Sequence, residues 1–128
     1  MTTDAQVHAT TGETGEALTL ALLRNSPDCV KVLNTSGRIG FMSENGRCAM
    51  EIDDFKAIAG KTWWDLWPEA NRADLAAAFG RSVSGEDVTY EGECPTAKGT
   101  PKRWTVRMTP IADDAGVVRS VLAVSREV

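Results

Sequence analysis

The sequence predicts one α+β domain, in which a β-hairpin, short helices, a longer helix and three antiparallel strands follow an amphipathic N-terminal helix. A length of 128 residues fits a single domain. The longest helical pattern, at 68–84, lies between two groups of strand-like segments, an order typical of the α+β class. These segments are 29–34 and 39–42 before the helix, and 87–93, 102–111 and 117–128 after it.

Charge and hydropathy restrict the classes of partner. The chain has 14 basic and 18 acidic residues and a net charge of −4, which argues against a nucleic-acid backbone as partner. Its apolar runs are all shorter than the ~18 residues of a membrane span. The first 17 residues lack the charged and apolar regions of a signal peptide. We therefore expect a cytoplasmic protein that does not insert into membranes.

Residues that could bind a metal are few and scattered. Cys29, Cys48 and Cys94 form no CxxC pair, and His8 is the single histidine. A zinc or iron–sulfur site is not expected from this pattern. Three reduced and packed thiols are the favoured interpretation, with a redox-sensing thiol as the alternative.

The N-terminal part divides into a tail and a helix. Residues 1–14 show no periodicity and are expected to be disordered. Residues 15–26 are expected to form an amphipathic helix with an apolar stripe, and the globular domain follows at 27–128. So short a helix is unstable alone and has to dock, either on the sheet of its own domain or on a second copy of the chain. The predicted docking residues are Leu18, Ala21 and Leu22.

The middle of the chain predicts a hairpin, short helices and a tryptophan-rich turn. Residues 35–38 connect the first two strands, helical turns are expected at 45–51 and 53–59, and Gly60 ends them as a left-handed cap. The stretch WWDLWP at 63–68 contains three of the four tryptophans, which could line a cofactor site, form a contact surface or fill a core. We favour the core for Trp63 with Leu66 or Trp67, and partial exposure for Trp64.

The long helix and the last strands have clear apolar faces. Pro68 suits the first position of the helix, Gly85 follows its end, and Gly80 in its interior suggests a close approach by another segment. The strand at 102–111 alternates cleanly, whereas 117–128 is apolar on both faces, which indicates a sheet covered on both sides near its middle. The helical stripe contains Leu75, Ala76, Phe79 and Val83.

Three phrases in order resemble a PAS domain, a sensory and interaction module of bacterial signalling proteins. They are SPDCVKVLNTSGRIGFMSENG, GKTWWDLWPE and TAKGTPKRWTVRMTPIADDAGVVRSVLAVSREV, and the resemblance covers about residues 18–128. It implies a five-stranded antiparallel sheet cupped by helices around a small cavity. It also implies a sensor that precedes an effector such as a histidine kinase, because SREV resembles the family's closing SRDIT. We expect this sensor to dimerise, or to dock to its effector, through the N-terminal helix and the outer face of the sheet. A domain cut from a longer protein is favoured over a stand-alone module.

The resemblance also bears on cofactors. Haem-binding members use a histidine of the long helix, and 68–84 contains none. Light-sensing LOV members carry a cysteine in a motif resembling GRNCRFLQ, and Trp63 takes that place in GKTWWDLW. Haem bound in this way and a flavin adduct are therefore not expected, while non-covalent flavin remains open. We expect no cofactor.

A ligand cavity and a closely packed core remain competing interpretations of the interior. Only Tyr90 and the Trp104 N–H offer polar groups that could converge on a small molecule, which favours the packed core. The residues expected to face inward, and hence the cavity candidates, are Met42, Met50, Phe79, Tyr90, Trp104 and Met108.

An enzymatic function is the alternative from a different class. A small isomerase-like α+β enzyme with a hydrophobic pocket would need a buried acid or base, such as Asp65 or Glu91. We expect no catalytic residue in this chain. The basic residues near the last hairpin are expected to form a solvated face, with Trp104 pointing away from it. They are Lys98, Lys102, Arg103 and Arg107.

Overall fold

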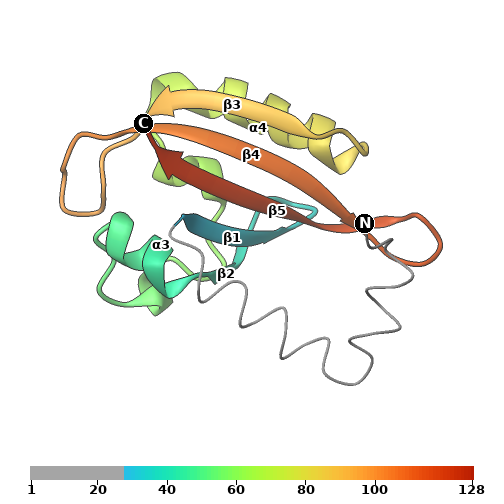
Figure 1. The fold of residues 1–128 in the computed structure, drawn as a ribbon, viewed down its shortest axis with the longest axis horizontal. Helices are drawn as coiled ribbons and strands as arrows, with labels where there is room; N and C mark the ends of the chain where they lie inside the picture. The colour runs from blue at the N-terminus through green and yellow to red at the C-terminus, as the bar shows by residue number, and fades with distance from the viewer. Residues whose placement is uncertain (1–27) are drawn as a thin grey trace, which may run out of the picture.

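The computed structural model describes residues 28–128 and confirms the predicted five-stranded antiparallel sheet. Its strand order is β2-β1-β5-β4-β3, so the first and last strands of the chain are central neighbours (Figure 1). The predicted tail at 1–14 and helix at 15–26, with Leu18, Ala21 and Leu22, lie outside the described residues. The strands are β1 (Cys29–Asn34), β2 (Ile39–Met42), β3 (Val88–Glu93), β4 (Arg103–Ala112) and β5 (Val118–Glu127).

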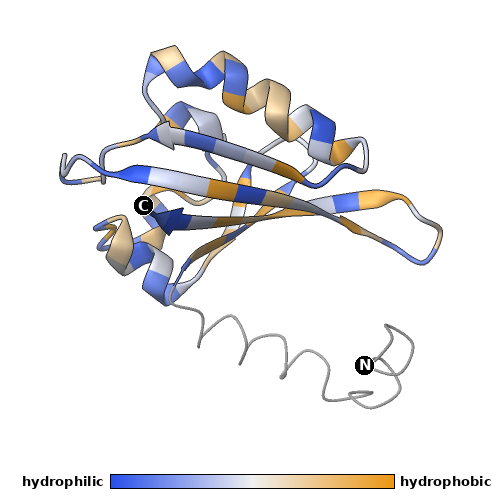
Figure 2. Ribbon diagram, turned by 45° about the horizontal axis from the view of Figure 1, so that its top comes forward, coloured by the Kyte–Doolittle hydropathy of each residue, from blue (hydrophilic) through white to orange (hydrophobic). Residues whose placement is uncertain are grey.

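Alternation along the strands separates a core face from an outer face. In β4, Trp104, Val106 and Met108 are buried, while Arg103 and Arg107 between them are exposed. This is the predicted pattern, and it follows because successive side chains of a strand point to opposite faces. Figure 2 shows the same alternation as hydrophilic and hydrophobic segments along the sheet.

Helix α4 (Glu69–Val83) lies against the β3 side of the sheet (Figures 1 and 2). It begins after Pro68 and ends before Gly85, which has a left-handed φ of 110°, so both predicted boundaries are confirmed within a residue. Its buried residues are Leu75, Ala78, Phe79 and Ser82.

No helix within residues 28–128 has the length and apolar character needed to cross a membrane.

The chain between β2 and α4, residues 43–67, crosses the core face and is called the cover segment below. It contains α3 (Glu44–Ala49) and the 3-10 helices η2 (Phe55–Ala57) and η3 (Trp63–Leu66). A Cβ atom on Gly46 would lie 2.9 Å from Cys29 Sγ. The glycine in α3 therefore allows the helix to rest directly on β1.

The tryptophan turn attaches the cover segment to the hairpin of β1 and β2. The Trp63 N–H donates to the Gly37 carbonyl at 2.9 Å, and the Trp64 ring lies so close that a Cβ on Gly37 would be 2.4 Å from it. Gly37 has a φ of 81°, so a larger residue there would strain the backbone and would also collide with the Trp64 ring. Trp64 is half-buried, with its ring centroid 5.4 Å from that of Phe79.

Trp67 attaches the other end of the turn to β3. A Cβ on Gly92 would lie 3.0 Å from its ring, and the Trp67 and Tyr90 ring centroids are 5.6 Å apart. Trp63 and Trp67 are 2% and 5% exposed. The prediction that these two tryptophans pack the cover segment onto the sheet is therefore confirmed.

The expectation of a close approach at Gly80 is wrong. Gly80 is exposed, and nothing lies within 4 Å of a Cβ placed there. The residue contributes only its backbone freedom, which opposes helix formation.

We predict that Gly80→Ala raises the free energy of unfolding by about 0.5–1 kcal/mol, because alanine restricts the unfolded chain and meets no obstacle in the helix. Urea unfolding followed by circular dichroism measures the change. The matched variant Gly46→Ala should lower stability by about 1–3 kcal/mol, since its Cβ would collide with Cys29. Equal effects of the two substitutions would contradict this assignment of their roles.

Candidate functional site

A small cavity lies between the cover segment and the core face of the sheet. Its volume is about 20 Å³, room for about one water molecule. Its walls are mostly apolar and aromatic, as is usual for ligand sites. The lining residues are Lys31, Met42, Met50, Ile52, Trp63, Leu66, Trp67, Cys94, Trp104 and Ser125.

Lys31 is the cationic residue of this wall and is only 3% exposed. Its Nζ lies 3.1 Å from Cys29 Sγ and 3.1 Å from Ser125 Oγ, and 5.7 Å from the centroid of the Trp63 ring. β1 places the lysine there because Cys29, Lys31 and Leu33 all face the core. Ser125 comes from β5, where it pairs with Cys29.

The surroundings of Lys31 stabilise a positive charge incompletely. Among residues 28–128, no carboxylate lies within salt-bridge distance of its Nζ, and none lines the cavity. A cysteine sulfur is a weak acceptor, and an ammonium has three protons to donate, for which Cys29 Sγ and Ser125 Oγ supply two acceptors. Buried charges are ordinarily paired with an opposite charge. The cavity therefore presents an ammonium able to bind an acceptor.

Cys94 adds a thiol to the wall without adding a nucleophile. Burial raises the pKa of its thiol to about 11, although the charge of Lys31 acts in the opposite direction. The thiol therefore stays protonated at neutral pH, and it lies 3.6 Å from the Leu66 carbonyl oxygen. Cys29 and Cys94 are both free thiols, and no cluster of metal-binding side chains is found within residues 28–128.

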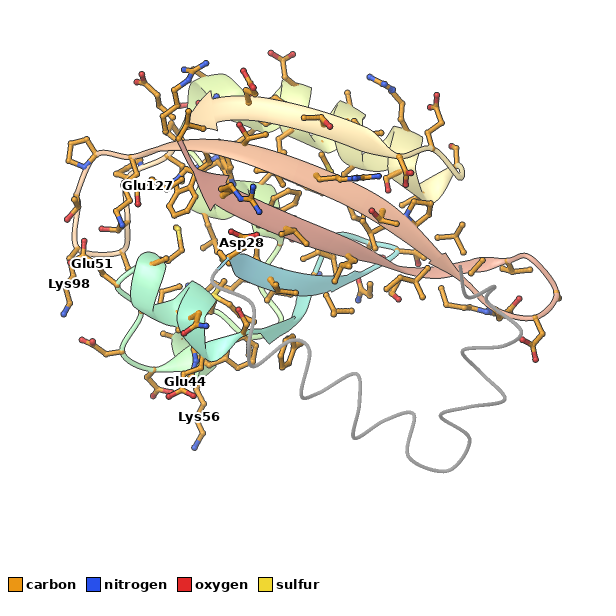
Figure 3. The ribbon with its side chains drawn as sticks, viewed as in Figure 1. Asp28, Glu44, Glu51, Lys56, Lys98 and Glu127 are labelled. Carbon is orange, nitrogen blue, oxygen red and sulfur yellow. The ribbon has the colours of Figure 1, made fainter. Side chains whose placement is uncertain are left out.

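Polar contacts connect the cover segment to the loop between β3 and β4. Glu51 Oε1 accepts from Thr96 Oγ1 at 2.6 Å and also from Thr100 Oγ1. These bonds, that of Thr100 first, lower the pKa of the Glu51 carboxyl. The Met50 carbonyl accepts from the Ala97 N–H at 2.9 Å, and Figure 3 shows Glu51 beside the loop that carries Lys98. This group of contacts, called the Glu51 clasp below, holds Met50 at the cavity wall.

The predicted cavity candidates separate into two groups. Met42, Met50 and Trp104 line the cavity, whereas Phe79, Tyr90 and Met108 lie outside it. Phe79 and Met108 are buried in the core cluster, and the Tyr90 hydroxyl accepts from Asn71 Nδ2 at 3.0 Å. The Trp104 Nε1–H donates to the Cys94 carbonyl at 3.0 Å, so both predicted polar groups already have partners.

Sequence reasoning missed the two polar groups that reach the cavity, Lys31 and Ser125. Both lie in strands that are apolar on both faces, so the alternation does not show which face each one occupies. The available signal was the spacing of Lys31 from Cys29 and Leu33, which places all three on one side.

The acidic residues of the enzymatic alternative lie at the surface. Asp65 and Glu91 are exposed, and Glu91 and Glu93 lie 3.8 Å and 3.9 Å from the Arg103 guanidinium. Arg103 and Arg107 are exposed as predicted, and Trp104 between them is 2% exposed and points to the core.

We predict that Glu51→Gln loosens the Glu51 clasp. A carboxyl with a lowered pKa stabilises the fold above its ordinary pKa of 4.5, and this contribution is lost as the pH falls through the lower folded value. The variant should therefore show less loss of stability than the parent between neutral pH and pH 3. Hydrogen exchange at residues 94–101 should become severalfold faster at pH 7.

Asp53→Asn is the matched control for the clasp. Asp53 belongs to the same segment and pairs with Lys98 at 3.4 Å, but both side chains are well exposed. Such pairs contribute little, so exchange in the loop should stay unchanged. Equal effects of the two variants would argue against the clasp.

Comparisons with known proteins agree with the architecture. A family model described as the PAS fold matches residues 23–128. The PAS domain of an HTR-like protein from Haloarcula marismortui is 20% identical, with a TM-score of 0.75 over 96% of this chain and 99% of that one. No curated protein shows significant sequence similarity to the chain.

Two further solved structures share this fold. A PAS domain from a two-component sensor histidine kinase has a TM-score of 0.71 and 13% identity, covering 91% of this chain and 98% of that one. VqmA bound to DPO, a protein of Vibrio cholerae, has a TM-score of 0.72 and 13% identity over 88% of this chain. This chain spans 57% of that VqmA structure. At such identities these structures support the fold, and the family model decides the membership: this chain belongs to the PAS fold family.

Proposed function

We propose that this chain is the sensory domain of a bacterial signal-transduction protein, the N-terminal sensor of a histidine kinase or a similar effector. In this proposal a small ligand enters the cavity below the cover segment, and the domain reports its presence by contact with a second copy. The observation that carries the proposal is a cavity with apolar walls and one buried, unneutralised ammonium. The similar fold of VqmA bound to DPO supports a ligand site, and that of the histidine kinase domain supports the output.

The proposed contact surface is the outer face of β1 and β5. Val30 pairs with Val124 and Val32 with Leu122, and these four side chains alternate with the core residues of their strands. Val32, Leu122 and Val124 are half-buried. A groove of about 560 Å³ adjoins this face, lined in part by Val124, Thr105 and Arg107. An apolar helical stripe with Leu18, Ala21 and Leu22 fits such a surface, and we propose that it docks there in a homodimer.

The remaining expectations follow from this function. A cytoplasmic location and a downstream effector domain as partner are both part of the proposal, and a bound cofactor is not. PAS domains are generally sensory modules without enzymatic activity of their own. The isomerase-like alternative has no support in the site, because Asp65 and Glu91 are exposed and lie outside the cavity.

We predict that the purified chain binds a small molecule in the cavity. Native mass spectrometry of the freshly expressed protein should show an added mass that denaturation removes. A ligand at tenfold its Kd stabilises by about 1.4 kcal/mol, so a metabolite screen should contain compounds that raise the Tm by roughly 4 °C or more.

A pair of phenylalanine variants locates the site of binding. Ile52→Phe fills the cavity and should abolish both the added mass and the rise in Tm. Val117→Phe adds the same ring at an exposed position of the β4–β5 turn and should leave both unchanged. A parent protein with no added mass and no responsive metabolite would refute the ligand-binding function.

We predict a homodimer that depends on the outer face of β1 and β5. Val124→Glu places a charge on that face and should convert the dimer to a monomer, and Leu22→Glu in the proposed helix should do the same. Thr89→Glu on β3, exposed at the far edge of the sheet, is the control and should remain dimeric. Size-exclusion chromatography with light scattering measures the mass. A parent protein that is monomeric at high micromolar concentration would contradict the prediction.

A further inference from the structure

Lys31 is buried, and no carboxylate among residues 28–128 lies within salt-bridge distance of its Nζ. Burial of an ammonium without a carboxylate destabilises a fold, and an apolar side chain of similar length would fill the same space without that cost. Its hydrogen bonds go to Cys29 Sγ and Ser125 Oγ, and its Nζ lies 5.7 Å from the centroid of the Trp63 ring. A residue that weakens the fold and faces a cavity is typical of a binding site.

The chemistry of the wall defines the missing partner. Lys31 Nζ and Ser125 Oγ lie 3.1 Å apart on adjacent strands, so one small acceptor group could bind both at once. A carboxylate has two oxygens for this purpose and supplies the absent negative charge. Apart from the Cys94 thiol, the remaining wall consists of indole rings, methionines and aliphatic side chains, which favour an apolar body.

The volume of the cavity restricts the size of this partner. About 20 Å³ holds a group of roughly the size of one water, so the apolar body needs additional space. Four side chains of the cavity wall have room or flexibility to change conformation. Met42 and Met50 are unbranched, and Ile52 and Leu66 are only half-buried. A rearrangement of these side chains would admit a small molecule while the strands beneath keep their places.

We propose that the cavity binds a small monocarboxylate with a short apolar or aromatic body, whose carboxylate bridges Lys31 and Ser125. This inference rests on the proposed ligand-binding function and specifies its substrate class. Lys31 determines the specificity, since it supplies the charge that a neutral ligand of the same shape would leave unpaired. The ring of Trp63, which already lies beside the ammonium, borders the same end of the site.

The test compares acids with neutral molecules of similar shape on the full chain. Benzoate and benzyl alcohol, butyrate and butanol, and hexanoate and hexanol are titrated while tryptophan fluorescence and Tm are recorded. We expect at least one acid to bind roughly tenfold or more tightly than its alcohol, the effect of one charge-assisted hydrogen bond. Acid and alcohol of equal affinity in every pair would overturn the carboxylate proposal while leaving the ligand-binding function intact. No binding by any acid would also overturn it, and the metabolite screen decides the broader function separately.

Lys31→Met and Lys102→Met form a matched pair. Each lysine has its Nζ 5.7 Å from the centroid of a tryptophan ring, but Lys102 pairs with Glu127 at 3.3 Å and does not line the cavity. Lys31→Met should remove the preference for the acid, keep the affinity for the alcohol, and melt at or above the temperature of the parent without ligand. Lys102→Met should retain the preference. An unchanged preference in Lys31→Met would refute the assignment.

Ser125→Ala keeps the proposal testable if Lys31→Met fails to fold. This substitution removes one hydroxyl and no charge, so the sheet is expected to form. The affinity for the best acid should fall severalfold and that for its alcohol should stay the same. Equal losses for the acid and the alcohol would mean that Ser125 acts only through packing, and this would overturn the bridging geometry.

Discussion

The distance between the cover segment and the sheet depends on the tryptophan turn. Trp64 lies against Gly37 on the β1–β2 hairpin, and Trp67 lies against Gly92 on β3 at the opposite edge. The turn thus spans the core face from one sheet edge to the other, and large rigid rings meet glycines at both ends. Because a Cβ on Gly37 would collide with Trp64 and one on Gly92 would be crowded by Trp67, the turn has little freedom to come closer to the sheet at either contact. The cavity at Lys31 adjoins this turn, with Trp63, Leu66 and Trp67 among its lining residues.

The second half of the cover segment is therefore fixed, while the first half depends on polar contacts. Met50 and Ile52 are held near the cavity through the Glu51 clasp, and Glu51 itself has a left-handed φ of 56°. A non-glycine residue in this conformation costs roughly 1–2 kcal/mol, which its bonds to two threonines offset. The cavity thus has a tryptophan side built on ring contacts and a methionine side held by hydrogen bonds of partly exposed residues. The proposed ligand would enter from that side.

The bounds and the core face of an element with one apolar face could be predicted from the sequence. The role of a residue that depends on a contact distant in the chain could not. β4 alternates between charged and apolar residues, so the sequence identifies both its bounds and its core face. In CVKVLN both faces are apolar, and only pairing with β5 reveals that Lys31 points inward. Gly46 and Gly80 cannot be told apart from the sequence either, because each lies inside a helix. Only the tertiary structure shows which one touches a neighbour. The positive φ of Glu51 depends on threonines about 45 residues away in the chain, and no local pattern contains that information.

The strand order connects the proposed site with the proposed contact surface. β1 and β5 are adjacent in the middle of the sheet, and their inward residues Lys31 and Ser125 form the polar end of the cavity. The outward neighbours Val30 and Val124 pair with each other one residue away, on the opposite face. A carboxylate that bridges Lys31 and Ser125 would contact both strands at once, and a change in their twist would move the side chains on both faces. The signal then has to cross only the thickness of one sheet, and no rearrangement of the helices is needed to carry it from ligand to partner.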